Sequence, residues 1–435
     1  MNTTESRGRR LPLVLRNPSF GRVWTAQLLT QAAGRMFQVG AVWWLIGFAA
    51  DGGQRGLEAG LFLTVSTLPA IALAPVVARV VARYPHRTVL AGAAGVAGTV
   101  AVPTALAAHA GEPPMAAVYA VGLALASCQA LFDPCLTTSV PELVEDADIE
   151  AATGFELSTQ SVAGLGGGLL GPLAVDAGGL ATVVATCGSA YLLAAVLVLS
   201  ARFADSGPDE ARVSDATHRT APARRTLREV LAGLPFIRRV LVCFAAANLF
   251  TTAVYVVMPL YARGVLHSTG STVAALEAAL GAGTLVGSFT GARVPGRPTT
   301  VGSVCLAVMA MALGLPGLVA AHVVALVSMA VAGWCVGVIG VRFVALFQRL
   351  VPAADKPGFF AVMQALLGAT FPVSSLVFGT LGDHLTARTL CLAQAAGLLP
   401  VAAVLWWLGS RTEPCGRRTS AGSTAARPAP AGEAS

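Results

Sequence analysis

Apolar residues gather into twelve long stretches separated by mostly short polar loops, and one longer polar interruption falls between the sixth and the seventh. A stretch of about 20 apolar residues is long enough to cross the hydrocarbon of a bilayer as a helix. We place the stretches at residues 20–49, 57–81, 88–110, 115–139, 151–175, 180–202, 238–262, 273–292, 299–320, 322–348, 358–381 and 387–409. The pattern predicts an all-α polytopic membrane protein with twelve transmembrane helices.

The two sets of six stretches also repeat each other at an offset of 207 residues. Leu143-Val144 then falls on Leu350-Val351, and Asp176 falls on Asp383. Such a repeat favours two pseudo-symmetric six-helix bundles related by an axis along the membrane normal, with substrate held near the midplane between them. The predicted organisation is a cytoplasmic segment 1–19, a first bundle 20–203, a cytoplasmic central loop 204–237, a second bundle 238–410 and a disordered cytoplasmic tail 411–435.

Composition and charge support this assignment. Hydrophobic residues make up 55% of the 435 residues and charged residues only 12%, well below the roughly 25% charged residues of a soluble domain. The net charge of +7 does not indicate nucleic-acid binding, because most Lys and Arg residues fall in the ends of the chain and in alternate loops. That asymmetry predicts cytoplasmic termini and insertion in the cell membrane, and the nearly lysine-free composition is typical of a bacterial protein.

Sequence motifs of membrane enzymes and ATP-driven pumps are not found. The chain shows no Walker lysine motif, HExxH, Gly-x-Ser-x-Gly or zinc-ligand spacing, and its cysteines occur singly. We therefore expect a protein that is not an enzyme, that needs no cofactor or metal, and that draws on an ion gradient, most plausibly of protons.

Four polar residues share one side of the first stretch: Gln27, Gln31, Arg35 and Gln38. Spacings of four, four and three residues place them on one stripe of a helix. Polar side chains at bilayer depth avoid lipid, so the stripe lines either an aqueous cavity or a contact with another helix. We favour the cavity.

The other polar candidates inside the bilayer are few. An ionisable residue there costs about 2.5–3.5 kcal/mol on insertion scales, so Asp133 in stretch 4 and Arg342 in stretch 10 need a partner or water. Asp133 either pairs with Arg35 or Arg342 in one access state and binds a proton in the other, or forms a permanent ion pair. Glu277 is either a second protonation site or a solvated residue at a helix end. Asn248 in stretch 7 is a candidate substrate contact. An aromatic wall is available from Trp43, Trp44, Phe250, Tyr255 and Tyr261, although aromatic residues near span ends are more often interface anchors.

Several short motifs carry a resemblance to a known family. They are Asn17-Pro18-x-Phe20, Phe132-Asp133-Pro134 with Pro141-x-Leu143-Val144, Pro259-Leu260-Tyr261-Ala262, Gly281-x-Gly283-xxx-Gly287 and Gln348-Arg349-Leu350-Val351-Pro352. With these motifs the chain resembles the major facilitator superfamily over residues 16–410, and within it the branch of macrolide efflux proteins and the enterobactin exporter. The resemblance implies that stretches 1, 4, 7 and 10 surround the central cavity.

The resemblance also suggests roles for glycines and charged residues outside the cavity. Gly167, Gly171 and Pro172 are similar to the antiporter motif of exporters, although Val175 and Asp176 replace its trailing glycines. Glycines four apart let a second helix approach closely, so ordinary helix packing is the alternative. In the loop after stretch 2, Ala82 stands where relatives carry an acid. The candidates for a cytoplasmic gate are Arg83, Arg87, Glu156, Gln160, Gln348 and Arg349.

Taken together, these features predict a secondary active transporter that exports small amphipathic molecules, such as antibiotics, natural products or siderophores, by alternating access with proton antiport. The expected partners are the small-molecule substrate, protons and the lipid bilayer, and we expect a monomer. Two alternatives stay open. One is an uptake symporter for a small anionic solute bound by Arg35 and Arg342, and the other is a membrane partner or sensor that has lost transport.

Overall fold

The computed structural model describes residues 12–49, 54–111, 113–145, 148–203, 235–351 and 356–412, and within these ranges the chain is almost entirely helical. The first bundle contains α2 (Leu13–Arg16), α3 (Pro18–Trp44) with the π-turn Leu45–Ala49, α4 (Arg55–Ala72), α5 (Ala74–Arg83), α6 (His86–Ala110), α7 (Met115–Leu143) and α8 (Ile149–Ser200). The second contains α11 (Pro235–Thr251), α12 (Val254–Gly264), α13 (Gly270–Gly291), α14 (Pro298–Leu318), α15 (His322–Leu350), α16 (Lys356–His384) and α17 (Ala387–Thr412).

The twelve predicted spans can be traced through these helices. In the described part of the chain, nine helices are long and apolar enough to cross a membrane, and the bent pair α4–α5 adds a tenth crossing. The long helix α8 crosses twice, because Gly178 and Gly179 leave helical geometry between its two parts. Gly179 has φ of 68°, a left-handed conformation in which an L side chain is strained. The remaining span is α3, whose polar stripe lowers its hydropathy.

Two spans differ from the prediction of straight helices. The second, expected at 57–81, breaks at Leu73, where α4 and α5 meet at an angle of 49°. Pro69 in the last turn of α4 and Pro75 in the first turn of α5 account for the break, because each proline lacks the amide hydrogen that continues a helix. The seventh span is divided into α11 and α12 at residues 252–253.

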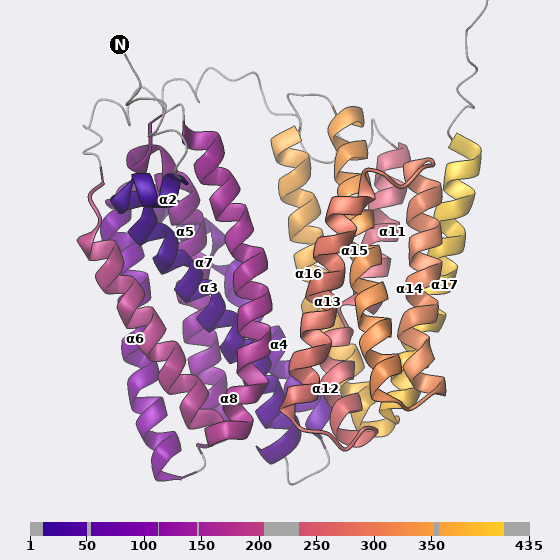
Figure 1. The fold of residues 1–435 in the computed structure, drawn as a ribbon, viewed down its shortest axis with the longest axis horizontal. Coiled ribbons are helices and arrows are strands. Elements are labelled where there is room, and N and C mark those ends of the chain that lie inside the picture. The colour runs from indigo at the N-terminus through magenta and orange to yellow at the C-terminus, as the bar shows by residue number, and fades with distance from the viewer. Residues whose placement is uncertain are drawn as a thin grey trace, which may run out of the picture.

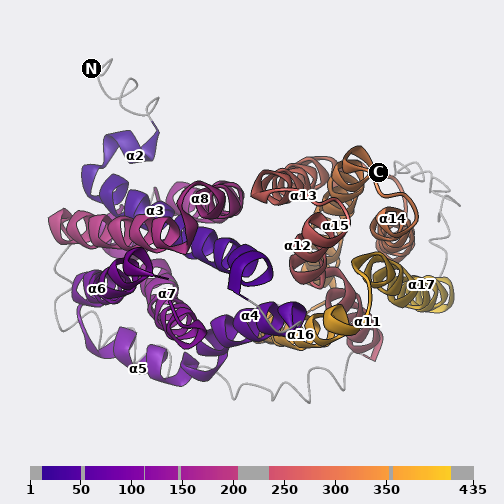
Figure 2. The same cartoon turned by 90° about the horizontal axis from the view of Figure 1, so that it is seen from below.

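The chain has two apolar cores. One joins buried residues of the first bundle and reaches Val256, Ala262 and Val273 of α12 and α13, and the other joins buried residues of α11 through α17. Figure 1 shows the bundles side by side, and the view in Figure 2 places α4 next to α16 and α8 next to α13. The predicted fold of two six-helix halves is therefore confirmed. The central segment 204–234 and the tail 413–435 lie outside the described residues.

The bundles touch mainly on one side. The start of α3, the start of α11 and the end of α17 lie together at the upper end of Figure 1, which we call the terminal side. Six hydrogen bonds join the halves within the described ranges between the middle of α3 and the opposite, closed side. The structure therefore represents a state whose halves are joined on the side away from the termini.

Candidate functional site

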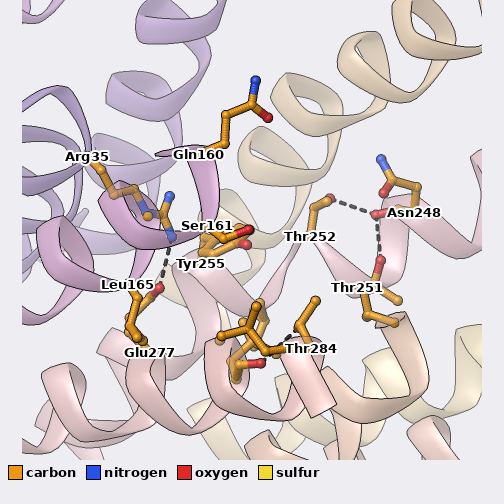
Figure 3. Close-up of a pocket in the computed structure, with 16 residues that line it drawn as sticks. Arg35, Gln160, Ser161, Leu165, Asn248, Thr251, Thr252, Tyr255, Glu277 and Thr284 are labelled. Atoms are coloured by element: carbon orange, nitrogen blue, oxygen red, sulfur yellow. Dashed lines mark hydrogen bonds and ion pairs between the residues drawn. The ribbon is translucent and has the colours of Figure 1, made fainter. Parts of the chain in front are cut away.

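A cavity of about 410 Å³ lies between the two halves (Figure 3). Its first-bundle wall comes from Arg35 on α3 and from a short stretch of α8, and its second-bundle wall comes from α11, α12, α13 and α15. The lining residues are Arg35, Gln160, Ser161, Gly164, Leu165, Asn248, Thr251, Thr252, Val254, Tyr255, Glu277, Leu280, Gly281, Thr284, Leu285 and Val336. This mixture of aliphatic, hydroxyl and amide groups can hold a molecule with both apolar and polar parts.

An ion pair crosses the cavity from one half to the other. The Nη2 atom of Arg35 lies 2.8 Å from Oε2 of Glu277, and Nη1 donates a hydrogen bond of 2.9 Å to the side-chain oxygen of Gln38. The guanidinium also lies over the ring of Tyr255, 4.7 Å from its centroid. Both charged side chains are mostly buried, with exposures of 21% and 16%, so each depends on the other for its stability in the bundle.

The position of Glu277 corrects one sequence-based expectation. One of its two interpretations was a solvated residue at a helix end, because the eighth span was placed from residue 273. The helix α13 instead begins at Gly270, so Glu277 lies two turns inside it and faces Arg35. Arg263 contacts the carbonyl of Gly47 at 3.0 Å and the ring of Trp43.

The polar stripe of α3 divides among three environments. Gln27 is buried, Gln31 donates to Asp133 over 3.3 Å, and Arg35 with Gln38 forms the group beside Glu277. Of the four, Arg35 lines the central cavity and Gln38 lines a second cavity whose lining comes from the first bundle.

That second cavity has a volume of about 270 Å³ and lies between α3, α4 and α7. Asp133 contributes its carboxylate, which accepts hydrogen bonds from Gln31 at 3.3 Å and Gln129 at 2.5 Å. Tyr191 donates to the oxygen of Gln129 at 3.2 Å. In this state Asp133 pairs with neither of the arginines proposed for it. The side chains of α7 line this second cavity and do not line the 410 Å³ cavity, so the expectation that stretch 4 lines the central cavity stays a prediction.

Arg342 does not line either cavity. Its guanidinium donates to the carbonyl of Gly296 in the loop between α13 and α14, within the second bundle. The pairing of Arg342 with Asp133, and its role beside Arg35 in binding an anion, therefore have no support in this structure. Asn248 does line the central cavity, but its amide donates to the carbonyl of Leu367 at 3.0 Å and to Thr370 at 2.6 Å. It thereby fixes α11 against α16.

The antiporter-like glycines lie in a close contact between helices. A Cβ atom at Gly167 would come within 2.5 Å of the Ala32 carbonyl oxygen, and one at Gly171 within 2.5 Å of that of Met36. Both glycines therefore bring α8 against α3, as the packing interpretation requires. The neighbouring Gly168 faces the other half, where its Cβ position is 3.4 Å from Oε2 of Glu277.

The candidate gate residues lie toward the terminal side and make contacts within one bundle. Arg87 donates to the carbonyl of Leu199, and Glu156 accepts from Thr137. Arg83, Gln348 and Arg349 are exposed, and Gln160 lines the central cavity. In this state none of the six joins the two halves through a hydrogen bond or ion pair within the described ranges, so their role as a gate stays a prediction.

The family model of the Major Facilitator Superfamily matches residues 23–353 of the chain. The chain belongs to this superfamily. Its fold agrees with that of solved transporters. A bacterial homolog of the human lysosomal transporter Spinster, inward-facing and occupied, superposes with a TM-score of 0.70 at 13% identity, over 90% of this chain and 96% of that one. A D-xylose–proton symporter gives 0.65 at 15% identity over 89% and 97%. The nucleoside transporter NupG gives 0.64 at 12% identity over 90% and 99%. Among curated proteins none matches. At these identities the structures share the fold alone with this multi-pass membrane transporter.

The polar site residues that the sequence did not single out are small hydroxyl side chains. Ser161, Thr251, Thr252 and Thr284 line the central cavity, but serine and threonine are common in membrane helices, where they bond to the preceding turn. Thr251, Thr252 and Thr284 make such bonds here. No spacing or charge in the sequence separates these residues from the others of their kind.

Proposed function

We propose that this transporter exports small amphipathic molecules by alternating access of the central cavity, in exchange for protons. The observation that carries the proposal is the Arg35–Glu277 ion pair, which joins the two halves inside the central cavity. That cavity is lined by both aliphatic and polar side chains. A volume of about 410 Å³ falls within the range of about 300–1,000 Å³ that is usual for small-molecule sites. Antibiotics, natural products and siderophores are the substrate classes that we favour.

Transport and its direction can be tested in a drug-sensitive bacterial host that lacks its own major exporters. Cells that express the chain should survive higher concentrations of part of an antibiotic panel and should accumulate less of those compounds. The matched control is Glu142→Gln, which removes a carboxylate paired with His86 at 2.7 Å, away from both cavities. Greater accumulation would instead identify an uptake carrier, and no change for any compound would indicate a protein without transport.

Proton coupling is assigned to Asp133 and the cross-half pair. Ionisable groups at bilayer depth commonly mark proton relays, and Asp133 has glutamine partners but no basic partner among the described residues. Arg35 lies on α3 one helical turn after Gln31, which bonds to Asp133. When the halves rearrange, Arg35 leaves Glu277 and turns toward Asp133, and Asp133 then loses its proton. This scheme retains the charge switch with Arg35 as the partner of Asp133, gives Arg342 no part in it, and makes Glu277 the partner of Arg35 in the other state.

The coupling proposal predicts different results for two assays of the Asp133→Asn variant. In inverted membrane vesicles, drug uptake driven by an imposed proton gradient should fall by at least about tenfold, because the amide cannot exchange a proton. Exchange of labelled for unlabelled drug without a gradient should persist, since substrate does not touch this residue. Equal loss in both assays would assign Asp133 to the structure of the bundle, and unchanged gradient-driven uptake would remove it from coupling.

A further inference from the structure

The guanidinium of Arg35 occupies a cage built from three groups that attract cations. These are the Glu277 carboxylate at 2.8 Å, the amide oxygen of Gln38 at 2.9 Å and the face of the Tyr255 ring, 4.7 Å from the centroid. A carboxylate, a carbonyl-type oxygen and an aromatic face are also the groups that recognise ammonium and guanidinium ions in ligands.

The cage is assembled from both halves of the molecule. Arg35 and Gln38 lie on α3 in the first bundle, whereas Glu277 lies on α13 and Tyr255 on α12 in the second. Figure 3 shows Arg35 against Glu277, and both Glu277 and Tyr255 line the cavity. Without Arg35, the second bundle would therefore keep an acid and an aromatic ring at the cavity. The cation and its strongest acceptor thus belong to parts that must separate in alternating access.

Ligand can reach the acid from the cavity. Both Glu277 and Tyr255 line it, and the Oε1 atom of Glu277 has no hydrogen-bond partner within the described residues. Leu165, Leu280 and Leu285 form an apolar surface beside them. A molecule with a cationic group at one end and an apolar body can therefore contact both kinds of surface at once.

Electrostatics then selects the charge of the ligand. Removing one member of a buried ion pair is costly, because the other is left uncompensated. A neutral or anionic molecule that displaced Arg35 would leave Glu277 without a counter-ion, whereas an organic cation would restore the charge balance. Arg35 itself would gain freedom to move toward the second cavity.

We propose that the Arg35 cage is the recognition subsite for an organic cation, whose ammonium or guanidinium group replaces Arg35 on Glu277 and Tyr255 and thereby releases the tie between α3 and α13. This inference rests on the proposed transport function and narrows its substrates to amphipathic amines and guanidines. In the protein without ligand, the Arg35 guanidinium occupies the place of the ligand's cationic group and so competes with the ligand for Glu277 and Tyr255.

The replacement mechanism can be tested by binding to the purified full-length protein in lipid nanodiscs. The probes are monodansylcadaverine, a fluorescent primary amine, and its N-acetyl derivative, which has the same fluorophore but no charge. The wild-type protein should prefer the amine by at least about tenfold, equivalent to about 1.4 kcal/mol. Glu277→Gln should remove this preference, and Glu142→Gln should retain it.

Arg35→Met provides the sharper result. If Arg35 competes with the ligand, its loss should tighten amine binding by about tenfold or more while binding of the acetylated probe stays unchanged. If the ion pair only holds the helices together, both Arg35→Met and Glu277→Gln should weaken binding of both probes. That second pattern would overturn the proposal.

A measurement on the wild-type protein tests the proposal even if the Arg35→Met and Glu277→Gln variants do not fold. A carbodiimide should label Glu277, as identified by mass spectrometry. The trimethylammonium derivative of the amine probe, which cannot couple to the activated carboxyl group, should protect Glu277, whereas the acetylated probe should not. Equal protection by both probes, or by neither, would reject the subsite.

The two proposals fail in different ways. Cellular export of both probes at the same rate, unaffected by Glu277→Gln, would reject the cation subsite and leave export standing. If neither probe nor any antibiotic is exported, the proposed function fails, while the binding and labelling results still decide whether the cage takes an organic cation.

Discussion

The two helix contacts that join the halves are related by the internal repeat but are built differently. We call them the α4–α16 seam and the α8–α13 seam. In the first, a Cβ atom at Gly60 would overlap the carbonyl oxygen of Ser375, so the backbones touch directly. In the second, a Cβ atom at Gly270 would meet the Pro172 carbonyl oxygen at 2.6 Å, at the closed end. Beside the cavity, however, Gly281 has only the Leu165 methyl group at 3.0 Å from its Cβ position, and Gly168 has Glu277 at 3.4 Å. The α8–α13 seam is therefore closed by backbone only at its end and by side chains beside the cavity.

The aspartates that end the two seams are equivalent in the repeat. Asp383 on α16 accepts hydrogen bonds from the amides of Gly56 at 2.7 Å and Leu57 at 2.9 Å, at the start of α4. Asp176 on α8 accepts from the amide of Gly270 at the start of α13, and from the Trp43 indole at 2.8 Å. Each aspartate therefore caps a helix of the opposite half, on the closed side.

This comparison suggests that the two seams have different roles in transport. The cavity is lined by α8 and α13 and by neither α4 nor α16, so a bound molecule meets side chains of one seam only. The glycine-rich α4–α16 seam leaves no room for ligand, and it can only close or separate as a whole. We infer that substrate acts on the α8–α13 seam and that the other seam follows.

The largest predicted difference between the seams comes from adding one methyl group. Gly60→Ala must push the α16 backbone away, and overpacking of this kind costs about 1–3 kcal/mol. The closed seam should then be populated about 5- to 150-fold less. Gly281→Ala should have little effect, because the Leu165 side chain can rotate. Distances between spin labels at Gln54 and Leu385 would report the opening, and equal distances in the two variants would contradict the difference between the seams.

A smaller effect is expected from removing the aspartate caps. Asp383→Ala and Asp176→Ala should each cost about 0.5–2 kcal/mol of closed-state stability, as for other helix caps. Both should shift the spin-label distances toward separation. Because the two caps lie in different seams, their effects in the double variant should add within about 0.5 kcal/mol. A double variant no worse than either single one would mean that the caps are not independent.

The sequence predicted the fold because membrane helices are marked by length and hydropathy, and the internal repeat marked the halves. It could not place the aspartates. The repeat showed only that Asp176 and Asp383 are equivalent, just past the ends of their predicted spans, and not that each finds amide donors on the other half. Such contacts join residues that are more than 90 positions apart, and no local pattern encodes them.

The candidate site was predicted in part for the same reason. Arg35 and Glu277 were both chosen because charges are rare at bilayer depth, but their pairing depends on how two separate bundles are docked. Asp133 was correctly chosen as a group in need of partners, whereas the sequence alone favoured arginine over the glutamines that it has in this state. The rarity of charged residues at bilayer depth therefore identifies which residues take part in the site. Which of them pair with each other depends on how the two bundles dock.

The smallest effect that would sharpen the comparison concerns a single hydroxyl group in the α4–α16 seam. Thr64 donates across the seam to the Pro372 carbonyl at 3.2 Å and also contacts the Gly60 carbonyl of its own helix at 2.8 Å. Thr64→Val keeps the shape and removes one bond between the halves, so it should cost about 0.5–1.5 kcal/mol of closed-state stability. Thr67→Val is the matched control, because the Thr67 hydroxyl bonds only within α4. If spin-label distances respond alike to both variants, the hydroxyl contributes to the helix rather than to the seam, and backbone contact together with the Asp383 cap accounts for closure of the α4–α16 seam.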